Sequence, residues 1–191
     1  YYNAEAIFME INFLQTLEER DYKAGICEAL KMAFTSDSKQ LTKFDLEAKR
    51  ILERNNDSLK DLIDWSIKTK LKHVCDDQNE KSIRLLLNYG HTFGQAIESY
   101  YGLYQNHLRH GEAVALGMVV AGKLSDLLGL STNPLAQETK RILGRFNLPT
   151  SFNDIDMSDI PCTEILVQNL INDKKRTSKG NRFVLCTMVG R

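Results

Sequence analysis

Apolar residues recur at helical spacing along most of the chain. Residues 21–34 carry Ile26, Leu30 and Ala33 on one side, which is the pattern of an amphipathic helix. The same spacing predicts further helices over 42–54, 59–74, 80–100, 111–128 and 163–172, and one that opens at Pro134. The run 55–58 offers an N-cap, and Gly102 and Gly129 stand where two of these helices would stop.

Only residues 182–189 (Arg-Phe-Val-Leu-Cys-Thr-Met-Val) have the β-branched and aromatic character of a strand. No repeat or linker divides the 191 residues. We therefore expect a mainly α fold. It would be a single helical bundle over residues 1–191 with a small β element near the C-terminus.

Composition narrows the classes of function. The chain has 25 Lys plus Arg and 25 Asp plus Glu, so its formal net charge is zero and gives no electrostatic case for nucleic acid or an anionic membrane. The longest mostly apolar stretch, 113–120, is far shorter than the roughly 20 residues that a bilayer requires. Four cysteines without CxxC spacing, and a first stretch unlike a signal peptide, predict free thiols in a reducing cytoplasm.

Two of the four histidines, His91 and His110, have glycine neighbours on predicted helices. A helical glycine costs about 1 kcal/mol relative to alanine. The glycines concerned are Gly90, Gly94, Gly111 and Gly117. Such positions usually mark the close approach of another helix or of a ligand.

If Gly102 turns the chain, the helices over 80–100 and 111–128 pack antiparallel, and His91 and His110 face each other. Two neutral imidazoles with a carboxylate suit a divalent metal with an open coordination position. Glu28, Glu98 and Glu112 are the acidic candidates. The alternative is that both imidazoles simply form hydrogen bonds in a helical core.

A second group of candidates is cationic. Arg84, Asn88 and His91 fall at i, i+4 and i+7, so they would share one helix face and suit an anionic, hydroxylated ligand. Lys70, Lys174 and Lys175 are the further cations considered. Lys174 and Lys175 also fit simple charge complementarity at a helix C-terminus, and Glu28 with Lys31 also fits a surface i,i+3 ion pair.

Taken together, the motifs resemble the 3-dehydroquinate synthase family of the shikimate pathway. The likeness rests on residues 88–94 (Asn-Tyr-Gly-His-Thr-Phe-Gly) and 110–114 (His-Gly-Glu-Ala-Val). It is extended by Gly25-x-x-Glu28-x-x-Lys31, by Asp77, Glu80, Arg84 and Asn88 in order, and by 173–175 followed by 182–185. The resemblance covers nearly the whole chain and implies the helical, C-terminal domain of that fold.

The resemblance also implies roles for particular residues. Glu28, His91 and His110 would be the ligands of the metal, normally Zn²⁺ or else Co²⁺. The groups that hold substrate hydroxyls, carboxylate and phosphate would be Lys31, Lys70, Arg84, Asn88 and one or both of Lys174 and Lys175, with Glu80 as an orienting acid. The family reaction converts 3-deoxy-D-arabino-heptulosonate 7-phosphate to 3-dehydroquinate and phosphate, with transient oxidation by NAD.

The chain departs from the family pattern in two ways. Gln95 stands at a catalytic position that is usually histidine, and glutamine does not exchange a proton near neutral pH. A variant sugar-phosphate cyclase, a metal-dependent polyol dehydrogenase and a non-catalytic helical module therefore stay open. Family members also carry an N-terminal NAD-binding half, of which we find no pattern here. We expect the 191 residues alone to be inactive and the complete enzyme to be a homodimer.

Overall fold

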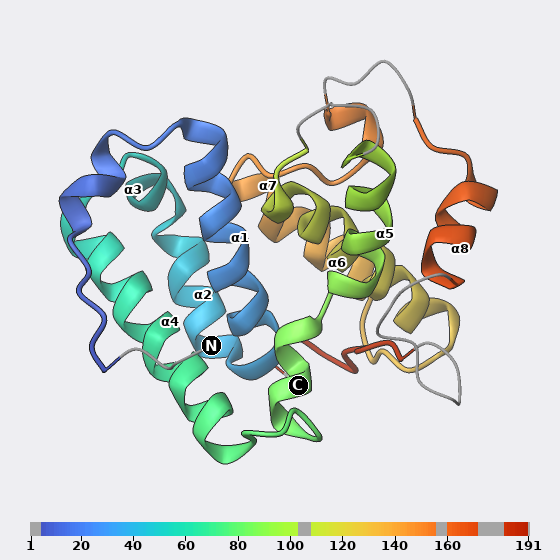
Figure 1. Ribbon diagram of the computed structural model, residues 1–191, viewed down its shortest axis with the longest axis horizontal. Helices are drawn as coiled ribbons and strands as arrows, with labels where there is room; N and C mark the ends of the chain where they lie inside the picture. The colour runs from blue at the N-terminus through green and yellow to red at the C-terminus, as the bar shows by residue number, and fades with distance from the viewer. Residues whose placement is uncertain (1–4, 103–107, 156–159, 172–181, 191) are drawn as a thin grey trace.

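The computed structural model describes residues 5–102, 108–155, 160–171 and 182–190, and these are mainly helical (Figure 1). The α-helices are α1 (Glu19–Ser36), α2 (Ser38–Leu46), α3 (Ala48–Leu52), α4 (Asn56–Asp76), α5 (His91–Gly102), α6 (His110–Leu127), α7 (Leu135–Arg145) and α8 (Thr163–Ile171). Short 3-10 helices are η1 (Ile11–Gln15), η2 (Ile83–Asn88) and η3 (Phe152–Asp154). The mainly α prediction is confirmed. Within the described residues, no helix is long and apolar enough to cross a membrane.

The helices form two groups that meet where α1 packs against α6 (Figure 1). The first group is α1 to α4, and the second is α5 to α8. One hydrophobic core crosses the boundary: Phe34 of α1 stacks on Tyr89 at a ring separation of 5.7 Å, and Met118 of α6 is buried in the same cluster. The shared core thus joins the segment just before α5 and the middle of α6 to α1.

Several helix ends follow the chemistry expected from the sequence. The Asn55 side chain accepts a hydrogen bond from the backbone N–H of Ser58 at 3.2 Å and so caps α4. Gly129 has φ +65° just beyond α6, and Pro134 directly precedes α7. These local signals set the ends of the helices correctly because they depend only on neighbouring residues.

Two predicted helices are each broken in the structure. The stretch 42–54 forms α2 and α3, because the backbone leaves helical geometry at Glu47. The stretch 80–100 forms η2 and then α5, because Gly90 adopts φ +74° between them. The expected common face of Arg84, Asn88 and His91 is therefore wrong, since a 3-10 helix has three residues per turn and ends before His91.

The predicted β element at 182–189 is also wrong: the described residues contain no strand. The segment makes single backbone contacts with separate elements, and a strand needs a continuous partner. Thr187 accepts a hydrogen bond from Thr132 N–H at 3.2 Å, and Gly190 donates one to Phe34 at 2.7 Å. Its apolar side chains pack instead, as Phe183 does on Phe93 at 5.0 Å.

The glycines beside the histidines allow the helices to touch, as their sequence positions predict. A Cβ on Gly117 would lie 2.0 Å from the carbonyl oxygen of Gly90, and one on Gly111 would lie 2.3 Å from that of Ala24. A Cβ on Gly94 would meet the backbone of Ala113 at 3.0 Å. The backbones of α1, α5 and α6 can therefore approach closely around one point, where the two histidines lie.

Candidate metal centre

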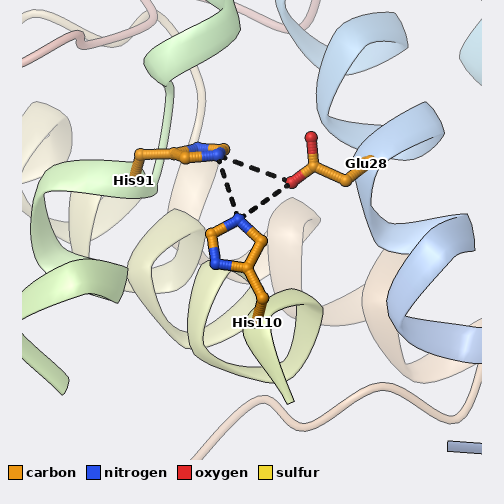
Figure 2. Close-up of side chains that lie close together, drawn as sticks. All are labelled: Glu28, His91 and His110. Atoms are coloured by element: carbon orange, nitrogen blue, oxygen red, sulfur yellow. Dashed lines mark hydrogen bonds and ion pairs between the residues drawn. The ribbon is translucent and has the colours of Figure 1, made fainter. Parts of the chain in front are cut away.

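Three side chains from three helices converge at that point (Figure 2). Glu28 comes from the middle of α1, and His91 and His110 are the first residues of α5 and α6. His91 Nε2 lies 3.3 Å from His110 Nε2 and 3.6 Å from Glu28 Oε1. His110 Nε2 lies 3.7 Å from the same Glu28 oxygen. The structure thus selects Glu28 from the three acidic candidates as the one facing both imidazoles.

The outer nitrogens of both imidazoles have acceptors as partners. His91 Nδ1 lies 3.3 Å from the carbonyl oxygen of Tyr89, and His110 Nδ1 lies 3.0 Å from Glu98 Oε2. Because a carbonyl and a carboxylate accept, both Nδ1 atoms carry the proton and donate it. With its proton on Nδ1, a neutral imidazole presents the lone pair of Nε2 toward Glu28, which is the tautomer that a metal ligand needs.

The second oxygen of Glu28 is held by a buried cation. Lys31 Nζ donates to Glu28 Oε2 at 2.6 Å, and Lys31 is only 2% exposed. Burial acts to raise the pKa of Glu28, but the charge and hydrogen bond of Lys31 outweigh it and lower that pKa. Burial also lowers the pKa of Lys31. The pair keeps Glu28 ionised. Because the Lys31 side chain is buried, the pair is not an ordinary surface ion pair.

Burial, and then the positive charge of Lys31, lower the pKa of His91 to about 4. His91 is therefore neutral at pH 7, with an unprotonated Nε2. Only the neutral imidazole can bind a metal through that atom.

The donor set fits a divalent cation. Glu28 Oε1 is buried and has no hydrogen-bond partner among the described residues, although it is an ionised oxygen. This oxygen and the Nε2 atoms of the two imidazoles face one another, an arrangement that a cation would stabilise. Two ligand atoms at roughly 2.1 Å from a tetrahedral zinc ion lie roughly 3.4 Å apart, close to the three separations observed.

The remaining predicted site residues differ in their exposure and in their hydrogen-bond partners. Lys70 is exposed on α4, and its charge acts on buried Lys31. Glu80, at φ +53°, accepts a hydrogen bond from Asn88 Nδ2 at 2.5 Å. Arg84 donates from its guanidinium to the carbonyl of Gln78 at 3.0 Å. Glu80 therefore orients the amide of Asn88, and Gln78 holds the guanidinium of Arg84.

Asp77 organises the loop that carries those residues. Its carboxylate accepts backbone N–H groups from Lys81, Ser82 and Arg84 at 2.9, 2.6 and 3.1 Å. These hydrogen bonds, first among them that of Lys81, lower the pKa of Asp77 to about 2. The acid therefore stays ionised and anchors the loop between α4 and η2.

Three predicted positions remain, and the structure describes one of them. Gln95 is partly exposed on α5, one helical turn beyond His91. Lys174 and Lys175 lie outside the described residues.

Sequence reasoning did not single out Arg20. Its guanidinium donates to both oxygens of Glu112, from Nε at 2.9 Å and from Nη2 at 2.6 Å. No local signal could have found this pair, because the two residues are 92 positions apart.

Comparison with known proteins identifies the family of the chain. Residues 25–176 match the family described as 3-dehydroquinate synthase C-terminal. The chain belongs to the 3-dehydroquinate synthase family. Among its relatives are the 3-dehydroquinate synthases of Campylobacter concisus (strain 13826), 37% identical, and of Helicobacter pylori (strain G27), 34% identical. Each match covers 100% of this chain and 51% of the relative, so the chain spans about half the length of these curated relatives.

Solved structures show the same helical fold in related synthases. A 2-deoxy-scyllo-inosose synthase complexed with carbaglucose-6-phosphate, NAD+ and Co2+ is 28% identical, with a TM-score of 0.77. ValA, a 2-epi-5-epi-valiolone synthase from Streptomyces hygroscopicus with NAD+ and Zn2+ bound, shares the fold at 22% identity and a TM-score of 0.75. Each comparison covers 95% of this chain and 48% of the other.

Proposed function

We propose that this chain is the metal- and substrate-binding helical half of a 3-dehydroquinate synthase. The complete enzyme would convert 3-deoxy-D-arabino-heptulosonate 7-phosphate to 3-dehydroquinate and phosphate, as a lyase of aromatic amino acid biosynthesis. The observation that carries the proposal is the convergence of Glu28, His91 and His110 beside buried Lys31. Family membership over residues 25–176 supports the reaction class.

In this proposal, Glu28, His91 and His110 hold Zn²⁺ or Co²⁺, the ions in the related synthase structures. When bound, the ion acts as a Lewis acid that polarises a hydroxyl or carbonyl oxygen of the substrate. Lys31 keeps Glu28 ionised through the 2.6 Å hydrogen bond.

The cationic and polar residues around the centre orient the substrate. Lys70, Arg84 and Asn88 supply positive charge and an amide donor for carboxylate, hydroxyl and phosphate groups, and Lys174 or Lys175 adds a further cation. Glu80 orients Asn88 through the hydrogen bond between their side chains. Holding the phosphate among fixed cations favours its departure.

NAD would bind mainly to the half of the enzyme that the curated relatives carry beyond this chain. A hydride acceptor is needed for the transient oxidation, and the described residues contain no sheet of the dinucleotide-binding kind. We therefore expect the 191 residues by themselves to form a single inactive domain. We also propose a homodimeric complete enzyme in the cytoplasm, where the free cysteines stay reduced.

An assay of the complete protein with NAD, Zn²⁺ and the heptulosonate phosphate tests this function. We expect phosphate release and 3-dehydroquinate in equal amounts, and neither product from the 191-residue chain alone. Robust dehydroquinate formation by the chain alone would overturn the proposal that the reaction needs the other half of the enzyme. Metal binding without any phosphate release by the complete protein would favour a non-catalytic module instead.

Gln95 supports a second candidate, a cyclase with another product. If Gln95 is a degraded proton relay, Gln95→His in the complete protein should raise kcat on the order of 10-fold or more, because imidazole exchanges protons near neutral pH. Steady-state rates measure this. Gln137→His, at an exposed glutamine of α7, is the matched control and should leave kcat unchanged. An unchanged or lower rate in Gln95→His would show an adapted glutamine and favour the variant cyclase.

A further inference from the structure

The ion pair between Arg20 and Glu112 joins the two helices that supply opposite sides of the metal centre. Glu112 is two residues from His110 on α6, and Arg20 is eight residues from Glu28 on α1. At 1.5 Å per residue, the pair lies roughly 12 Å along α1 from the carboxylate of the centre. The ion pair is thus close enough to set the position of α6 relative to α1, and it does not contact the metal ligands.

Glu112 does two things at once. Its Oε1 and Oε2 accept from Arg20 Nε and Nη2, a two-pronged geometry that fixes direction as well as distance. Its Oε2 also accepts the backbone N–H of Arg109 at 2.9 Å, which caps the first turn of α6. The start of α6, where His110 lies, is therefore tied to α1 by one carboxylate.

The residue on the other side of His110 is tied to α1 as well. Arg109 forms ion pairs with Asp21 at 2.6 Å and with Glu18 at 2.8 Å. Between these two ties, Gly111 lets the backbones touch, since a Cβ there would lie 2.3 Å from Ala24 O.

His110 needs such support because packing does not hold it. Its side chain is 46% exposed, whereas that of His91 is 14% exposed. Outside the site itself, its imidazole contacts the carboxylate of Glu98, at 3.0 Å. The position of its Nε2 relative to Glu28 therefore follows from where α6 begins.

We propose that Arg20 and Glu112 are positioning residues of the metal centre, acting through the first turn of α6 on His110. This inference rests on the metal site of the proposed function. Outer partners of metal ligands usually contribute 10- to 100-fold in metal affinity. Because Arg20 and Glu112 act as one unit, their effects on that affinity should not add.

The test is a set of variants of the complete protein: Arg20→Met, Glu112→Gln and the double variant. Zn²⁺ affinity is measured by competition with a chelator, and the visible spectrum of bound Co²⁺ reports ligand geometry. We expect each single variant to bind Zn²⁺ about 10-fold more weakly, with a changed Co²⁺ spectrum. The double variant should bind about as weakly as either single variant.

The control is an ion pair of the same kind away from the centre. Arg141 of α7 pairs with Asp45 at 2.8 Å, and the side-chain exposures, 48% and 18%, resemble those of Arg20 and Glu112, 45% and 13%. Arg141→Met should leave Zn²⁺ affinity unchanged. Unchanged Zn²⁺ affinity in both single variants, or a double variant about 100-fold weaker, would overturn the positioning role. A wild-type protein that binds neither metal would instead overturn the proposed function on which it rests.

Discussion

Replacing His110 by alanine in the complete protein should abolish stoichiometric zinc binding and leave the helical fold intact. His110 is half-exposed, so its loss opens no cavity in the core, but it removes one of three proposed ligands. The loss of Zn²⁺ affinity should exceed about 100-fold, the upper end for the loss of an outer partner alone. Activity at limiting zinc should fall below about 1% of wild type. Metal analysis after dialysis and circular dichroism measure the two effects.

Two further variants make this result specific. Glu28→Gln keeps the shape of the side chain but removes its charge, and it should also lose zinc. Cys75→Ser is the control, because the exposed thiol of Cys75 could bind zinc but lies outside the centre. This variant should keep its zinc. Retention of stoichiometric zinc by His110→Ala, or its loss in Cys75→Ser, would contradict the assignment.

Gly117→Ala should destabilise the protein more than an ordinary helix substitution. The new Cβ would lie 2.0 Å from Gly90 O and 2.7 Å from Gly94 N, and both are backbone atoms that cannot rotate away. Overpacking of this kind costs about 3 kcal/mol or more when the backbone must shift. The melting temperature of the complete protein, followed by circular dichroism, should fall by about 5 °C or more.

Gly144→Ala is the matched control for this prediction. It changes a glycine of α7 around which a Cβ would meet nothing within 4 Å. Its melting temperature should stay the same or rise, because alanine stabilises a helix by at most about 1 kcal/mol relative to glycine. If Gly117→Ala melted like Gly144→Ala, the close approach of α5 and α6 would not constrain the fold as described.

The sequence led to the centre through its glycines. The sequence placed four glycines beside two histidines on predicted helices, which pointed to the close approach of another helix or of a ligand. That inference from local chemistry was correct. The turn expected at Gly102 separately placed His91 and His110 face to face, although the third ligand stayed open among three acids.

The errors came from features that neighbouring residues do not determine. The helix predicted over 80–100 breaks at Gly90, because Gly90 adopts φ +74° where its backbone approaches Met118 of α6. The strand predicted over 182–189 lacks a partner, which β-rich composition alone could not reveal. The tie between Arg20 and Glu112 joins residues 92 positions apart, so only the fold brings it into view.

The most direct test of this account is the coordination of zinc in the intact complete protein, measured by X-ray absorption spectroscopy. The account requires one zinc ion per chain, bound by two imidazole nitrogens and by oxygen, with no sulfur ligand. The two imidazoles would be His91 and His110, and the protein oxygen would be Glu28 Oε1. A sulfur-bound ion, a site with fewer than two imidazoles, or a protein that binds no zinc would contradict it.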